Sequence, residues 1–124
     1  MSIEFTRLVP IFHVDDLAAE RAFYMQLGFT VNFEDEGLPD FIAFKHGTVE
    51  FGIERREGFD STAPDKTLML QFGIKDVDNA KAHLEAQQLA YSEREVIVST
   101  GWKYRMLAVQ SPNGYTVWLE GERE

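Results

Sequence analysis

The sequence predicts an α+β fold built from two βαβββ modules, with eight strands and two helices, because the chain repeats itself. When the chain is displaced by 60 residues, Phe12 falls on Phe72 and Asp16 on Asp76. The pattern of each copy predicts, in order, an apolar strand, an acidic helix cap, a helix and further strands. Solenoid repeats recur at shorter periods, roughly 20 to 50 residues. The repeat therefore indicates two halves of one domain, related by pseudo-symmetry.

The first half predicts one helix between an apolar strand and three further strands. Asp15 or Asp16 can cap the helix, since a carboxylate accepts hydrogen bonds from the N–H groups of a first turn, and Gly28 is suited to end it. Residues 29–33 alternate apolar and polar side chains, as a half-buried strand does, and residues 46–47 form a tight hairpin turn. The expected strands are 5–14, 29–33, 41–45 and 48–55.

The second half repeats this plan after a polar connection at residues 56–66. Asp76 or Asp78 caps a helix that runs to about Gln88. A turn at residues 111–114 joins the last two strands. The expected strands are 68–74, 91–98, 102–110 and 115–120.

Length and composition favour one packed domain over residues 1–124, with halves of about 1–60 and 61–124. Hydrophobic residues make up 44% and aromatic residues 13% of the chain, which suits a packed core. From the repeat we expect two curved sheets, each with its helix on the convex face, that face each other across a central cup. The chain has no cysteine, which excludes disulfides, thiolate metal sites and cysteine nucleophiles.

The acidic balance argues against nucleic acid and membranes as partners. The formal net charge is -9, and its field repels nucleic acid and anionic membrane surfaces. The same field attracts a cationic ligand, although acidity also serves ordinary solubility. No apolar run approaches the roughly 18 to 20 residues that span a bilayer, and the start of the chain does not resemble a signal peptide. We therefore expect a cytoplasmic protein.

Four short motifs follow one another over nearly the whole chain: VDDL at 14–17, AFY at 22–24, LGF at 27–29 and SPNGY at 111–115. Together with the βαβββ repeat they resemble the glyoxalase / bleomycin resistance / extradiol dioxygenase superfamily, also called the vicinal oxygen chelate fold. In the last motif Ser111 replaces the family's Asp. Fold alone does not define function, because members include metal-dependent isomerases, dioxygenases, thiol transferases and metal-free proteins that bind bleomycin-type drugs.

The resemblance implies where a metal would bind. The enzymes of the family hold a divalent metal in the cup with His, Glu or Gln from the first and fourth strands of each half. These positions fall on Val9, Glu50, Met69 and Trp118. One carboxylate beside a valine, a thioether and an indole cannot hold a catalytic transition metal. We therefore expect no metal, no cofactor and no catalytic residue.

The resemblance also implies a ligand site. The run WKYRMLAVQSP at 102–112 is similar to a segment of the bleomycin-resistance branch, with Trp102 and Arg105 at matching positions and Lys103 in place of a Gly. In that branch aromatic residues sandwich the planar part of the drug, since flat rings stack on flat ligands. The candidate ligand-binding residues are Phe33, Phe41, Glu50, Met69, Trp102, Tyr104, Arg105 and Trp118.

Three of these residues allow more than one interpretation. Glu50 is either a counter-ion or general base in the cup or a solvated residue on an edge strand. Met69 and Trp118 either line the cup or pack the core. The histidines His13, His46 and His83 are scattered along the chain and lack the spacing of a metal site.

We expect a metal-free, bleomycin-resistance-like homodimer that sequesters a small, cationic and partly aromatic compound, as in antibiotic resistance. The two subunits would pair side by side or exchange an N-terminal strand, as family members do. One alternative is an enzyme of the same fold, either a metal-dependent lyase, isomerase or dioxygenase or a protein that uses Glu50 as a base. Another is a chain whose cup is closed by Met69 and Trp118 and which serves only in dimerisation or regulation.

Overall fold

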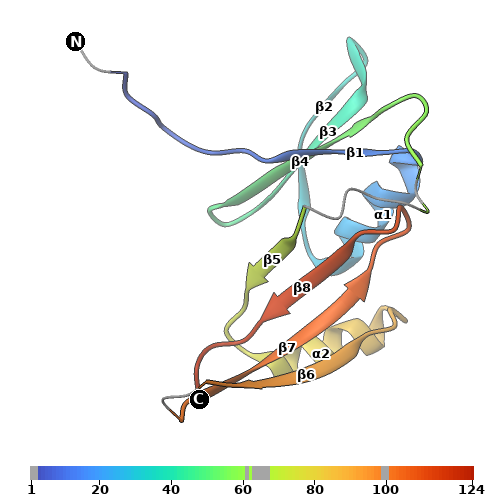
Figure 1. Ribbon diagram of the computed structural model, residues 1–124. Coiled ribbons are helices and arrows are strands. Elements are labelled where there is room, and N and C mark those ends of the chain that lie inside the picture. The colour runs from blue at the N-terminus through green and yellow to red at the C-terminus, as the bar shows by residue number, and fades with distance from the viewer. Residues whose placement is uncertain (1–2, 61, 63–67, 99–100) are drawn as a thin grey trace. The chain divides into compact units, whose positions relative to one another are not determined.

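The computed structural model describes residues 3–60, 62, 68–98 and 101–124 and divides the chain into two compact units (Figure 1). Unit 1 comprises Met1–Asp60 and unit 2 comprises Ser61–Glu124. Within the described residues each unit holds one helix and four strands in the order βαβββ. The predicted α+β fold with two modules is confirmed. The single-domain organisation and the facing of the two sheets across a cup stay predictions.

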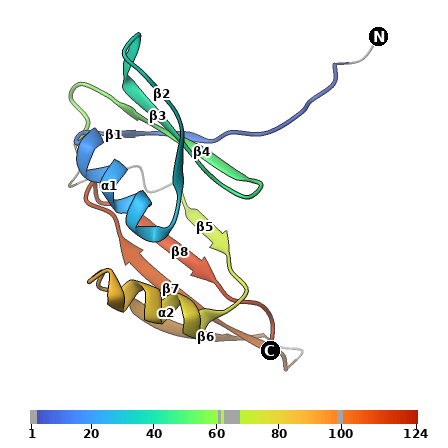
Figure 2. The same cartoon turned by 180° about the vertical axis from the view of Figure 1, so that it is seen from behind.

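The four strands of unit 1 form a mixed sheet in the order β1-β4-β3-β2. β1 runs parallel to β4, whereas the pairs β4–β3 and β3–β2 are antiparallel. Helix α1 packs on one face of this sheet (Figure 2). The elements are β1 (Ile11–Val14), α1 (Leu17–Leu27), β2 (Thr30–Asp35), β3 (Leu38–His46) and β4 (Val49–Arg55).

Unit 2 has the same topology, with strands in the order β5-β8-β7-β6. β5 is parallel to β8, and the other pairs are antiparallel. Helix α2 packs against β7. The elements are β5 (Leu70–Gly73), α2 (Val77–Ala86), β6 (Ser92–Ile97), β7 (Lys103–Gln110) and β8 (Thr116–Glu120).

The first strand is shorter than the sequence predicts. We expected a strand over 5–14, but β1 begins at Ile11, and the preceding residues form an extended segment that leaves the sheet (Figure 1). The carbonyl of Pro10 still accepts a hydrogen bond of 2.8 Å from the Gly52 N–H. Proline has no backbone N–H, so Pro10 can accept a hydrogen bond from β4 but cannot donate one. The ladder therefore ends at this residue.

Aromatic rings form the core between α1 and its sheet. The centroids of the Tyr24 and Phe51 rings lie 4.8 Å apart, and those of Phe44 and Phe51 lie 5.2 Å apart in a stacked arrangement. Phe12 of β1 stacks on Phe51 at 5.9 Å. Such pairs contribute roughly 0.5 to 1.5 kcal/mol each beyond the area that they bury. Phe51 of β4 therefore links α1, β1 and β3.

In unit 2, aliphatic side chains form the core between the helix and the sheet. Arg105 of β7 bonds Asp78 of α2, which identifies the face of the sheet that the helix covers. Because side chains alternate along a strand, Leu107 lies on the same face as Arg105. The buried residues that share this alternation are Leu70, Leu107, Val109, Val117 and Leu119.

Both helices begin at an aspartate cap. The Asp16 carboxylate accepts a hydrogen bond of 3.0 Å from the Ala19 N–H, and Asp76 accepts one of 3.0 Å from the Asn79 N–H. Of the candidates that the sequence offered, the caps are therefore Asp16 and not Asp15, and Asp76 and not Asp78. Gly28 ends α1 with a φ of 116°, a left-handed conformation that favours glycine, as the sequence predicts.

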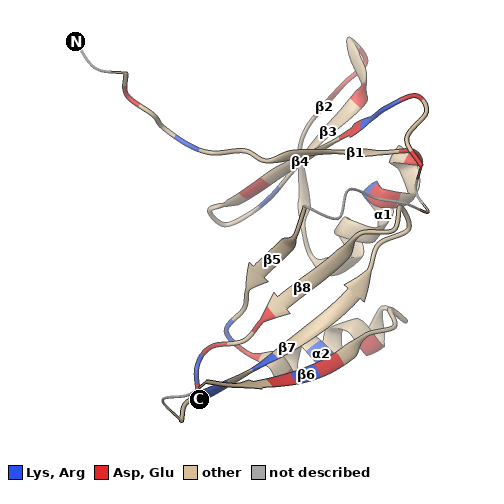
Figure 3. Ribbon diagram, in the orientation of Figure 1, with Lys and Arg blue, Asp and Glu red and all other residues tan. Residues whose placement is uncertain are grey.

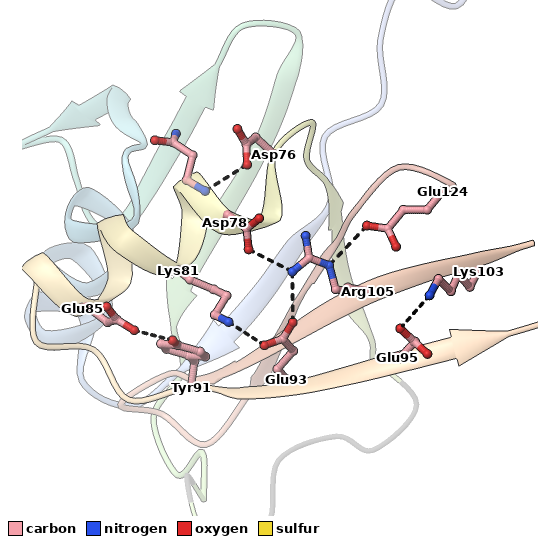
Figure 4. Close-up of polar contacts among 11 residues, drawn as sticks. Asp76, Asp78, Lys81, Glu85, Tyr91, Glu93, Glu95, Lys103, Arg105 and Glu124 are labelled. Carbon is pink, nitrogen blue, oxygen red and sulfur yellow. Dashed lines mark hydrogen bonds and ion pairs between the residues drawn. The ribbon is translucent and has the colours of Figure 1, made fainter.

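A charge network centred on Arg105 joins α2, β6, β7 and the residues after β8 (Figure 4). Its guanidinium nitrogens lie 2.9 Å from Asp78, 3.3 Å from Glu93 and 3.4 Å from Glu124. Glu93 also lies 2.7 Å from the Lys81 ammonium. The hydrogen bond from Arg105 lowers the pKa of Asp78, and the one from Lys81, with help from Arg105, lowers the pKa of Glu93.

Removing the cap of α2 tests the assignment of Asp76. We expect Asp76→Ala to lower the free energy of unfolding by about 1 kcal/mol, because the Asn79 N–H loses its acceptor. Asp76→Asn is the matched control and should lose little, since asparagine caps a helix about as well. Urea unfolding followed by circular dichroism gives both values. Equal losses in the two variants would contradict the capping role.

The Arg105 network predicts how stability depends on pH. Because Asp78 and Glu93 have lowered pKa values, their contribution is present above the unfolded values of about 4 and is lost as pH falls through the folded values. In Arg105→Gln the decrease in stability on acidification should be less steep between about pH 5 and pH 2. Thermal melting over that range measures it, and Arg94→Gln, at an exposed arginine of β6, is the control. An unchanged slope in Arg105→Gln would refute the role of Arg105.

Candidate functional site

Each sheet has a second face, opposite its helix, and we call it the distal face. In unit 1, Phe51 belongs to the core against α1, so its neighbours Glu50 and Gly52 lie on the distal face. Ala43 of β3 pairs with Gly52 in the ladder, and Phe41, two residues earlier, lies on the same face. Phe33 of β2 pairs with Ala43 and so shares this face. The predicted site residues of unit 1 therefore lie together on this face, on β2, β3 and β4.

Glu50 is half-buried and already bound by two side chains of unit 1. Its Oε1 atom accepts a hydrogen bond of 3.0 Å from Arg7 Nη1 and one of 3.3 Å from Asn32 Nδ2. The Glu50 side chain is 17% exposed, whereas Arg7 is 63% exposed. An ion pair with so exposed a cation is weak and exchangeable. A cation from outside the chain could therefore replace Arg7 at this carboxylate.

Phe33 and Phe41 lie side by side at 6.1 Å between ring centroids. Phe41 approaches the backbone closely, because a Cβ atom added to Gly52 would meet its ring at 2.9 Å. Phe41 also lines a shallow pocket of about 330 Å³ at the β2–β3 hairpin. The carboxyl-bearing residues Glu34, Asp35 and Glu36 line the same pocket.

The distal face of unit 2 carries the other candidate aromatic residues. Tyr104 and Trp118 lie on this face, because their neighbours Arg105 and Leu119 lie on the face that α2 covers. Trp118 pairs with Gln71 on one side and with Ala108 on the other.

The ladders show a register that the 60-residue repeat alone does not predict. Ile11 pairs with Gly52 in unit 1, and Gln71, which lies 60 residues after Ile11, pairs with Trp118 in unit 2. Trp118 therefore takes the place of Gly52 in its own unit and puts a large indole where unit 1 has no side chain.

An open pocket of about 540 Å³ lies at one end of the distal face of unit 2, and we call it the Trp102 pocket. The centroids of its Trp102 and Tyr104 rings lie 5.8 Å apart, with 34° between their planes. Glu120 also lines it and accepts a hydrogen bond from the Gln71 side chain. The lining residues are Gly73, Ile74, Lys75, Trp102, Tyr104, Glu120, Gly121, Glu122 and Arg123.

The structure brings some of the predicted site residues together and separates others. Trp102 and Tyr104 share the pocket, whereas Met69 stands just before β5 with 68% of its surface exposed. Trp118 is on the distal face but is not among the residues that line the pocket. Arg105 lies on the opposite face, bound to the carboxylate of Asp78. It is not among the residues that line the pocket, and its role in ligand binding stays a prediction.

Sequence reasoning missed the charged residues of the Trp102 pocket. Glu120 could have been found, because it follows Trp118 at the strand period of two and must share its face. Lys75 and Arg123 carried no such signal, since they lie outside the helices and strands.

The residues at the family's metal positions do not fit a metal ion. Val9, Met69 and Trp118 offer no donor that suits such an ion, and the Glu50 carboxylate is held by Arg7 and Asn32. Among the residues that the structure describes, no three His, Asp or Glu side chains gather in a way that could hold a metal. In the same part of the chain, neither helix is long and apolar enough to cross a membrane.

Solved structures with the same fold include a drug-binding protein and two proteins that are named after glyoxalases or lyases. A bleomycin-binding protein complexed with bleomycin is 18% identical, with a TM-score of 0.70 over 95% of this chain and 99% of that chain. A glyoxalase family protein from Enterococcus faecalis is 22% identical, with a TM-score of 0.71 over 94% and 98%. A lactoylglutathione lyase from Agrobacterium tumefaciens is 18% identical, with a TM-score of 0.66 over 97% and 96%. At these identities the likeness shows the fold alone.

The sequence has no significant match among curated proteins. The family model of the glyoxalase/bleomycin resistance protein/dioxygenase superfamily, however, matches residues 7–119. This match covers most of both units and agrees with the βαβββ topology that each of them shows. The chain therefore belongs to the glyoxalase/bleomycin resistance protein/dioxygenase superfamily.

Proposed function

We propose that this protein binds and sequesters a small, cationic and partly aromatic compound without the help of a metal, in the manner of a bleomycin-resistance protein. The Trp102 pocket is the observation that carries this proposal. It offers two neighbouring rings, Trp102 and Tyr104, for stacking, and the Glu120 carboxylate as a partner for positive charge. The fold that the chain shares with a bleomycin-binding protein supports the same role.

The charge of the chain favours a cationic ligand. The formal net charge is -9, and acidic residues gather at the β2–β3 hairpin and along β6 (Figure 3). Such a field raises the rate at which cations arrive, and more so at low salt. Steering of this kind contributes to capture, which is the step that a sequestering protein needs.

The distal face of unit 1 is the second proposed binding surface. There the half-buried Glu50 would exchange its exposed partner Arg7 for a positive group of the ligand. Phe33 and Phe41 would provide apolar contact. In unit 2, Met69 and Trp118 would add apolar surface, and Arg105 would act indirectly by holding β7 in place through Asp78 and Glu93.

Two single variants test the two surfaces separately. With a cationic bleomycin, Glu50→Gln should weaken binding by up to about 1.5 to 3 kcal/mol, because the hydrogen bond loses the negative charge of its acceptor. Trp102→Ala should weaken binding by roughly 1 to 3 kcal/mol through the loss of one stacked ring.

Calorimetry on each variant, with the cationic drug and an uncharged analogue of the same shape, provides the comparison. Glu50→Gln should weaken binding of the cationic drug more than binding of the uncharged analogue. Trp102→Ala should weaken binding of both compounds to the same extent. An equal loss for both compounds in Glu50→Gln would remove Glu50 from the site. The absence of any binding by the unaltered protein would overturn the proposed function.

We also propose that two copies form a twofold homodimer. The extended segment before β1 exposes large apolar side chains, with Ile3 at 78%, Phe5 at 88% and Leu8 at 84% of their surface. Apolar groups so exposed in one segment are typical of a contact surface. A closed twofold pair would cover the segment of each copy in the same way.

Light scattering at micromolar concentration should therefore give the mass of a dimer. The double variant Phe5→Ser and Leu8→Ser should shift the protein towards the monomer, because the apolar area that drives pairing is lost. Thr6→Ser, in the same segment, is the control and should remain dimeric. A monomeric unaltered protein would end this proposal.

A further inference from the structure

One cation of the chain already lies on the proposed ligand-binding ring. The guanidinium carbon of Arg123 is 5.2 Å from the centroid of the Trp102 ring. Both residues line the Trp102 pocket. At less than about 6 Å a guanidinium over an indole face is attracted by the electron density of the ring. The Trp102 face therefore accepts a planar cation, and here the chain itself supplies it.

The backbone around Arg123 is anchored without the help of this side chain. The Gly121 N–H donates a hydrogen bond of 2.8 Å to the Arg105 carbonyl, and the Glu124 N–H donates one of 2.7 Å to the Lys103 carbonyl. These bonds hold the residues after β8 beside β7. The Arg123 side chain can therefore leave the ring by a change of rotamer while both backbone bonds remain.

A stacked ligand and the Arg123 guanidinium need the same space. Aromatic groups stack with centroids about 4.5 to 7 Å apart, and Arg123 lies within that range of Trp102. We propose that Arg123 is an internal competitor, which occupies the Trp102 face and must move aside before a planar cation can stack there. This inference rests on the proposed role of Trp102 in ligand binding.

The charges of the pocket indicate which ligand class can replace Arg123. The residues that line the pocket include two with positive charge, Lys75 and Arg123, and two with negative charge, Glu120 and Glu122. When Arg123 moves out, one positive charge is missing beside two carboxylates. A ligand with its own planar positive group restores the balance, whereas a neutral ring does not. The pocket is therefore selective for planar cations, such as guanidinium groups or N-alkylated aromatic rings.

The experiment uses the two tryptophans of the chain as reporters. The protein has Trp102 and Trp118 alone, so its indole N–H groups give two nuclear magnetic resonance signals. The probe is N-methylquinolinium, a planar cation, with neutral quinoline as its matched partner. Without probe, Arg123→Ala should shift the Trp102 signal and leave that of Trp118 in place.

Titration then measures competition. Arg123→Ala should bind N-methylquinolinium about two- to fivefold tighter than the unaltered protein does, because a surface cation–π contact no longer has to be broken. Arg94→Ala removes the same charge outside the pocket and should leave the affinity unchanged. Quinoline should gain less than the cation. Equal, weaker or absent binding of N-methylquinolinium in Arg123→Ala, or an equal gain in Arg94→Ala, would overturn the inference.

The outcome is separable from that of the proposed function. If the chain sequesters no bleomycin-type drug, calorimetry with the drug shows no heat, yet Arg123→Ala can still admit N-methylquinolinium to Trp102. If the inference alone is wrong, the unaltered protein binds the drug, and Arg123→Ala binds N-methylquinolinium no tighter than the unaltered protein does.

Discussion

Each sheet has one of its two faces covered by a helix, and this constraint determines where the candidate functional side chains on the strands lie. In unit 1 the rings of Tyr24 and Phe51 join helix to sheet, and in unit 2 Leu107 and its buried neighbours do so. Since side chains alternate along a strand, the residues between those that face the helix lie on the distal face. Glu50 and Tyr104 are on that face for this reason alone, and Arg105 is excluded from it for the same reason.

Two arginines of this acidic chain are bound to groups that a cationic ligand would also contact. Arg7 binds Glu50, and Arg123 covers Trp102. Both contacts lie at the candidate binding surfaces, where solvent weakens them. Arg105, by contrast, holds three carboxylates at once and serves the structure of unit 2. A ligand would therefore compete with the weaker contacts and leave the network that holds β7 to α2 in place.

Local signals in the sequence predicted local structure well. The aspartate caps and Gly28 act within a few residues, so the ends of α1 follow from the order of residue types. Strand lengths were predicted less well, because a strand persists only where a neighbour can pair with it. The expected strand over 5–14 shortened to Ile11–Val14 once the ladder reached Pro10.

The sequence by itself determined the two βαβββ modules and the family, because each depends on periodicity and short motifs. It narrowed each helix cap to two aspartates, and the structure selected Asp16 and Asp76. The sequence also named Trp102 and Tyr104 as site candidates, through the resemblance to the bleomycin-resistance branch and the stacking of flat rings on flat ligands. Only the tertiary structure decided that Glu50 binds Arg7 and that Arg123 covers Trp102. These pairs are 43 and 21 residues apart in the chain, and the folded backbone, not any local pattern, brings them into contact.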